Sequence, residues 1–87
     1  MFLVKIYITL KPGVNDPQGL TIRGGLHQLG FDTVADVRAG KYMEIKLDQE
    51  DRNAACGRVT EMCDQLLANP IIEEFRFELE PIEPTSL

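Results

Sequence analysis

The chain has 87 residues, of which 44% are hydrophobic and 26% are charged, and its formal net charge is −5. This length fits a single domain with one core and leaves no room for a second. The acidic balance argues against nucleic-acid binding, which needs a concentrated basic face. The sequence has no run of the roughly 20 apolar residues that span a bilayer, so we expect a cytoplasmic protein with no membrane partner.

Residues 2–10 form the first predicted element, a strand in which apolar residues alternate with others. One face carries Phe2, Val4, Ile6, Ile8 and Leu10. The other face is only half polar, because Leu3 and Tyr7 stand beside Lys5 and Thr9. A chain this short buries only about 60% of the surface that its unfolded form exposes, so association of chains is expected. We therefore predict that Leu3 and Tyr7 contact a second copy in a dimer.

The next predicted element is a helix that begins after Asp16. An aspartate followed by Pro17 is typical of an N-cap and a first helical residue, and Gly30 is a typical left-handed terminator. The apolar residues between them follow helical spacing at Ile22, Leu26 and Leu29. Gly24 and Gly25 each cost the helix about 1 kcal/mol relative to Ala. Their presence indicates that another element packs closely at this point.

A hairpin is predicted over residues 34–47, with strands at 34–38 and 41–47. The second strand alternates cleanly, and the two strands meet at a short turn around Gly40. Two cations, Arg38 and Lys41, flank this glycine. The pattern fits a solvated turn with protective charges, and it equally fits a surface that contacts a partner.

A second helix follows the hairpin. It is predicted to be capped by Asp48 or Asp51 and to end at Asn69 and Pro70. Its apolar stripe, spaced to face a sheet, comprises Ala55, Val59, Met62, Cys63, Leu66 and Leu67.

The last predicted strand covers residues 75–80, where apolar and charged residues alternate. The domain therefore spans residues 1–80, and residues 81–87 are predicted to form a flexible tail. The element order is β, α, β, β, α, β. This order is typical of a ferredoxin-like α+β fold, in which an antiparallel sheet carries two helices on one face. We expect such a domain to dimerise through the sheet.

The residues able to carry chemistry do not form a catalytic set. Cys56 and Cys63 lie about 10.5 Å apart along a helix, beyond the roughly 7 Å that a disulfide allows, and both are predicted to be small buried hydrophobes. His27 is expected at the surface or at an interface. Glu73 and Glu74 are adjacent on a strand and therefore point to opposite faces. The sequence thus predicts no catalytic residue and no metal site, and it favours a binding or assembly role.

Five stretches stand in order along almost the whole chain: VKIYITLK (4–11), DPQG (16–19), LHQLGF (26–31), VRAGKY (37–42) and MCDQLLANPIIE (62–73). Together they resemble the PurS family, the small subunit of phosphoribosylformylglycinamidine synthase. The resemblance implies a noncatalytic homodimer, with a tetramer left open. It also implies a bridge between a glutaminase, which releases ammonia, and a large synthetase, which uses ATP to convert formylglycinamide ribonucleotide to its amidine in purine biosynthesis.

The resemblance assigns the chemistry to the partners. ATP and Mg²⁺ act in the synthetase, and no cofactor is expected on this chain. Arg38, Gly40, Lys41, Asn69 and Pro70 belong to the matched stretches. We predict that they contact the synthetase, where an acidic patch would attract the two cations.

Two other functions fit a ferredoxin-like domain, because the fold alone does not decide function. One is a regulatory domain that senses a small molecule at a dimer interface. The other is an acylphosphatase-like enzyme, which would need an arginine in the loop after the first strand, where this chain has Lys11. The sequence also departs from the family pattern at residues 23–25, where helix formers are expected, and in its longer tail after Leu79.

Overall fold

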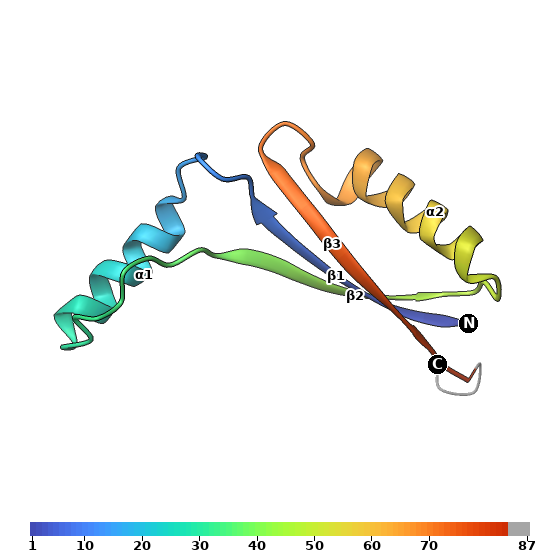
Figure 1. The fold of residues 1–87 in the computed structure, drawn as a ribbon, viewed down its shortest axis with the longest axis horizontal. Helices are drawn as coiled ribbons and strands as arrows, with labels where there is room; N and C mark the ends of the chain where they lie inside the picture. Colours follow the sequence, from blue (N-terminus) through green and yellow to red (C-terminus); the bar gives the residue numbers. More distant parts are fainter. Residues whose placement is uncertain (84–87) are drawn as a thin grey trace.

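Three antiparallel strands and two helices make up residues 1–83, the part of the chain that the computed structural model describes (Figure 1). The elements are β1 (Phe2–Leu10), α1 (Pro17–Gln28), β2 (Gly40–Leu47), α2 (Arg52–Met62), η1 (Cys63–Leu67) and β3 (Glu73–Pro81). η1 is a turn of π-helix that continues α2. The strand order is β2-β1-β3, with β1 antiparallel to both neighbours. The predicted α+β class with an antiparallel sheet is confirmed.

The core lies between one face of the sheet and α2. Its buried residues are Phe2, Val4, Ile6, Ile8, Ala55, Val59, Cys63 and Ala68. Ile6 pairs with Met43 on β2 and with Phe77 on β3, so both edge strands extend the same apolar face. Residues two apart on a strand share a face, which is why the alternation along β1 predicted its buried side correctly.

α1 and the segment that follows it project away from the sheet, and we call residues 13–39 the arm (Figure 1). The radius of gyration is 16.7 Å, whereas a compact chain of this length has about 12 Å. Within α1, which the structure describes in full, Gly19 is the single buried residue. α2 covers the sheet as predicted, but α1 extends past it. The helical spacing of Ile22, Leu26 and Leu29 therefore does not bring them into the core cluster of this chain, and Leu29 is 75% exposed.

The first strand of the predicted hairpin is wrong. Residues 34–38 lie within the described part of the chain and form no strand; they run back along α1, to which His27 Nε2 links them by a 2.8 Å hydrogen bond with the Val34 carbonyl. Both edges of β1 are already occupied by β2 and β3. In addition, the Asp36 side chain accepts a hydrogen bond from the Val37 amide at 2.9 Å, which competes with strand pairing.

The second helix is capped by Asp51, one of the two predicted residues, through a hydrogen bond from the Asn53 amide. Its predicted stripe is wrong at Leu66, which is 82% exposed. The cause is η1, where the Ala68 amide donates to the Cys63 carbonyl five residues back. This wider turn shifts the register of the side chains that follow. Ala68 is buried in place of Leu66.

Two further expectations change. Nothing within the chain lies within 4 Å of a Cβ placed on Gly24 or Gly25, so the predicted close packing is absent from the described residues. β3 continues to Pro81, one residue past the predicted boundary at residue 80, and the Ile82 amide donates to the Met1 carbonyl at 3.0 Å. The rest of the predicted tail, residues 84–87, lies outside the described part.

Neither α1 nor α2 is long and apolar enough to cross a membrane.

Candidate interaction site at the loop end

The residues predicted to contact a partner come together where β1 ends and where β2 and β3 begin. We call this region the loop end; it comprises residues 10–14, 38–41 and 69–73. The two predicted segments are about thirty residues apart in sequence. The antiparallel pairing of both edge strands with β1 brings them to the same end of the sheet.

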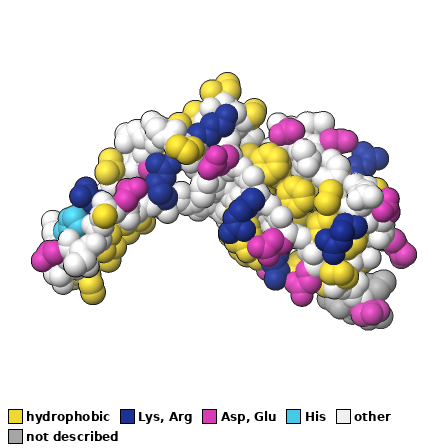
Figure 2. Space-filling view, in the orientation of Figure 1, with side chains coloured by type: hydrophobic (Ala, Val, Ile, Leu, Met, Phe, Trp, Pro, Cys, Tyr) yellow, Lys and Arg dark blue, Asp and Glu magenta, His cyan; other side chains and the backbone are white. Residues whose placement is uncertain are grey.

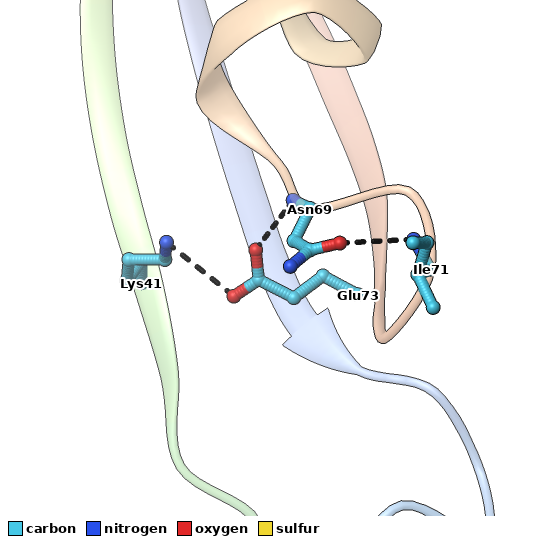
Figure 3. A network of polar contacts seen from close by, with 4 residues as sticks. All are labelled: Lys41, Asn69, Ile71 and Glu73. Carbon is cyan, nitrogen blue, oxygen red and sulfur yellow. Dashed lines mark hydrogen bonds and ion pairs between the residues drawn. The ribbon is translucent and has the colours of Figure 1, made fainter.

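A polar network joins these segments (Figure 3). Lys41 Nζ lies 3.3 Å from Glu73 Oε2, and Glu73 Oε1 accepts a 2.7 Å hydrogen bond from the Asn69 amide. Asn69 Oδ1 in turn accepts from the Ile71 amide at 3.0 Å. The Asn69 amide, followed by Lys41, lowers the pKa of Glu73 below its ordinary value. Lys41 and Asn69 are thus held by contacts within the chain.

Two main-chain carbonyls of the turn at residues 69–73 accept hydrogen bonds from Lys11, which directly follows β1. Lys11 Nζ donates to the Pro70 carbonyl at 2.7 Å, and the Lys11 amide donates to the Ile72 carbonyl at 2.8 Å. Ile71 nevertheless remains 80% exposed. The turn therefore presents an apolar side chain on a fixed backbone. Sequence reasoning missed Ile71, because an isoleucine before a strand also fits the start of that strand.

Arg38 and Gly40 are also engaged within the chain. Arg38 Nη2 donates to the carbonyls of Leu10 at 2.9 Å and Lys11 at 3.2 Å. A Cβ on Gly40 would come within 2.5 Å of the Ile8 carbonyl oxygen, so glycine is needed where β2 approaches β1. Contact of these residues with the synthetase stays a prediction.

Asp16 caps α1 as predicted, and it has a second role. Its carboxylate accepts hydrogen bonds from the amides of Gly19 and Ala39, both at 2.9 Å. These bonds lower the pKa of Asp16 below its ordinary 3.8 although burial of the group opposes this, and the Arg38 guanidinium contributes in the same direction. The carboxylate is therefore charged and committed to backbone amides, which leaves it unsuited to acid–base chemistry.

The two predicted dimer-contact residues lie on the open face of the sheet, opposite α2. The Tyr7 ring lies between the Tyr42 ring, at a centroid distance of 5.0 Å, and the Arg76 guanidinium, 3.9 Å from its centroid. Leu3 and Tyr7 are both half-buried by their own chain. Their contact with a second copy stays a prediction.

The nucleophilic and metal-ligating residues are dispersed. Cys56 and Cys63 both carry free thiols; Cys63 is buried as predicted, and Cys56 is only half-buried. Burial raises the pKa of the Cys63 thiol, which disfavours the reactive thiolate. No group of three or more His, Cys, Asp or Glu residues within the described part of the chain could hold a metal ion.

Comparison with known proteins identifies the family. The model of the PurS family, described as phosphoribosylformylglycinamidine (FGAM) synthase, matches residues 3–81. The chain belongs to the PurS family. A PurS subunit of this synthase from Synechocystis sp. is 48% identical over 79 residues, which cover 91% of this chain and 79% of the relative. The resemblance stated from the sequence is confirmed.

Solved structures of PurS proteins have the same fold. The Methanocaldococcus jannaschii PurS, one of the subunits of formylglycinamide ribonucleotide amidotransferase in the purine biosynthetic pathway, has a TM-score of 0.86 and 38% identity, covering 95% of this chain and all of that one. A chain from the structure of Thermotoga maritima PurLQS has a TM-score of 0.83 and 29% identity, covering 91% of this chain and 96% of that one. The chain is thus a PurS subunit of FGAM synthase, an enzyme of purine biosynthesis.

Proposed function

We propose that this PurS chain is a noncatalytic assembly subunit that bridges the glutaminase and the ATP-dependent synthetase of FGAM synthase. The observation that carries the proposal is the arm, which exposes apolar side chains that the chain itself leaves uncovered. The carboxylates at and beside the loop end hold main-chain groups, because Asp16 accepts the Gly19 and Ala39 amides and Glu73 accepts the Asn69 amide. The relative from Thermotoga maritima PurLQS supports an assembly role.

Self-association is proposed to use one side of α1. Ile22, Gly25 and Leu29 are spaced i, i+3, i+7 and so share that side, and each is exposed. Figure 2 shows hydrophobic side chains along the lower edge of the arm. A second copy is the natural occupant, because an exposed apolar surface on a small protein marks an interaction site and most oligomers are symmetric.

A tetramer would require a second, distinct interface. The open face with Leu3 and Tyr7 supplies one, whereas the sequence analysis placed these two residues in the dimer contact. Its ion pair, with Lys5 Nζ 3.0 Å from Glu80 Oε2, makes it more polar than the arm. We therefore assign the arm to the dimer and the open face to pairing of dimers.

The loop end is proposed to contact the synthetase. Lys41 and Arg38 are exposed cations there, and they would attract an acidic patch on the partner. Ile71, on its fixed turn, would supply the apolar anchor. Gly40, Asn69 and Pro70 would act by shaping this surface.

The chemistry is assigned to the partners. We propose that this chain binds no cofactor, that ATP and Mg²⁺ act on the synthetase, and that the complex works in the cytoplasm. Ammonia released by the glutaminase would then be used by a synthetase held in the same assembly.

Reconstitution tests this function. The purified chain, glutaminase and synthetase are mixed, and formation of the amidine is measured with glutamine and, separately, with free ammonia. Glutamine-dependent turnover should require the chain, whereas ammonia-dependent turnover by the synthetase should not. Leu29→Asp should impair self-association and glutamine-dependent turnover together. Leu66→Asp, a similarly exposed leucine outside the arm, is the matched control.

Two results would contradict the proposal. One is full glutamine-dependent turnover without the chain. The other is a rise in melting temperature of the isolated chain with an amino acid or nucleotide, without binding to either partner, which would indicate the small-molecule-sensing domain that the sequence left open.

A further inference from the structure

The base of the arm is fastened by Asp16. One oxygen of its buried carboxylate accepts the Gly19 amide and so caps α1, and the other accepts the Ala39 amide, 23 residues further along the chain. Ala39 directly precedes β2. A single carboxylate thus ties the start of α1 to the start of β2, at the point where the chain leaves the sheet and the point where it returns.

Arg38 also links the two chain segments at the base of the arm. Its Nη2 donates to the carbonyls of Leu10 and Lys11 at the end of β1, and its Nη1 donates to the Val14 carbonyl at 3.4 Å. The guanidinium therefore ties the returning segment to the outgoing one. Five donors in a planar fork suit this multiple contact, which a lysine could not reproduce.

The arm itself is a stiff body. A Cβ on Gly19 would overlap the Val37 carbonyl oxygen, so α1 and the returning segment touch backbone to backbone near the base. Further out, His27 Nε2 is 2.8 Å from the Val34 carbonyl oxygen. The two halves of the arm are fixed to each other at both ends, and its direction depends on how its base is held.

We propose that Asp16, Gly19 and Arg38 form a joint that sets the direction in which the arm leaves the sheet, and thereby sets whether the arm reaches a second copy. Asp16 is the central positioning residue of this joint. The proposal rests on the proposed self-association through the arm. If the joint is loosened, the arm samples many directions, and the apparent affinity falls in proportion to the fraction that remains competent to bind.

The substitution Asp16→Asn tests the joint while it keeps the helix cap. Asparagine caps helices about as well as aspartate, but its NH2 group replaces one of the two oxygens that accept the Gly19 and Ala39 amides, and an NH2 group cannot accept. The variant should keep the helix content of the wild type while self-association weakens about tenfold or more, the scale of one lost charge-assisted hydrogen bond. Asp36→Asn is the matched control, because this substitution removes the same charge from the arm and, among the described residues, the Asp36 side chain accepts only from its neighbour, Val37.

The direction of the arm can be measured independently of function. Spin labels on Thr33→Cys, in the exposed outer part of the arm, and Glu50→Cys, beyond β2, report their distance in a Cys56→Ala background, with labelled chain diluted in excess unlabelled chain. Cys63 is buried and stays unlabelled. The distance distribution should be narrow in the wild type and in Asp36→Asn, and broad in Asp16→Asn. Arg38→Lys should broaden it as well.

The outcomes separate this inference from the proposed function. A narrow distribution in Asp16→Asn, with wild-type self-association, would overturn the joint and leave assembly intact. A broad distribution with unchanged self-association would show that the arm is not the contact and would overturn the inference too. A wild-type chain that stays monomeric and binds neither partner would refute the proposed function, whatever the distances.

Discussion

Lys41 and Glu73 form an ion pair that spans the central strand. Lys41 pairs with Ile8 and Glu73 with Leu10, so both side chains lie on the face of the sheet that carries α2. The pair joins the second residue of β2 to the first residue of β3, two edge strands that otherwise contact only β1 in the sheet. Lys41 is therefore at an end of the core and not at the tip of a free hairpin.

The glutamate should matter more for stability than the lysine. Glu73→Ala removes both the ion pair and the acceptor for the Asn69 amide, and we expect a loss of about 1–2 kcal/mol in unfolding free energy. Lys41→Ala should cost less than about 1 kcal/mol, since the ammonium is largely exposed. Urea unfolding measures both. Glu74→Ala, the exposed neighbour on the opposite face, should be close to neutral, and equal effects for all three variants would contradict this assignment.

Stability should fall in acid because of Asp16 and Glu73. The folded protein holds both pKa values below their ordinary 3.8 and 4.5, so the unfolded chain binds protons first as the pH drops. Their contribution is complete above the ordinary values and is lost as the pH falls through the lowered ones. Melting temperature measured from pH 6 to about pH 3 should decline less steeply in Asp16→Asn than in the wild type. If the melting temperatures of the two proteins decline in parallel, Asp16 is not a source of the pH dependence of stability.

The two mid-helix glycines should respond differently to alanine. Both face open space within the chain, so either substitution should raise helix stability, by up to about 1 kcal/mol. Gly25 lies between Ile22 and Leu29 on the proposed contact side, whereas Gly24 does not. Gly25→Ala should therefore weaken self-association in sedimentation experiments and Gly24→Ala should not. If Gly24→Ala and Gly25→Ala self-associate equally, close packing at Gly25 is excluded.

Cys63 and Cys56 should differ in reactivity and in packing. Burial raises the pKa of the Cys63 thiol, so a thiol reagent should modify Cys56 first in the folded chain. Cys63→Ala should lower the unfolding free energy by about 1–2 kcal/mol and Cys56→Ala by less. Turnover of the assembled enzyme should survive both changes. Loss of turnover in a complex that assembles normally would assign a chemical role to the thiol.

Ile71 should contribute to partner binding without contributing to folding. Ile71→Ser replaces a side chain that is largely exposed, so the melting temperature should change little. Binding to the synthetase, measured by calorimetry, should weaken by roughly 1 kcal/mol or more if the side chain is an anchor. Leu66→Ser provides a control of similar exposure outside the loop end. Unchanged binding of Ile71→Ser to the synthetase would show that the docking face lies elsewhere.

The sequence by itself determined the elements whose signals are local. Alternation in β1 depends only on the period of a strand, and Asp16, Pro17 and Gly30 mark the ends of α1 through their own backbone chemistry. The sequence alone was therefore enough to predict the buried side of β1, the cap at Asp51 and the family resemblance. Cys63 was predicted to be buried for the same reason, since it continues the spacing of Ala55 and Val59.

Only the tertiary structure decided which surface each element meets. The apolar residues of α1 have the spacing of a core helix, yet the direction set at Asp16 and Arg38 takes the helix past the sheet. Residues 34–38 have strand-like composition, but β1 has no free edge for them. Only the tertiary structure shows that the Arg38 guanidinium also donates to the carbonyls of Leu10 and Lys11 within the chain. Periodicity reports which side of an element is apolar, whereas the partner that covers that side is fixed by contacts between residues far apart in the chain.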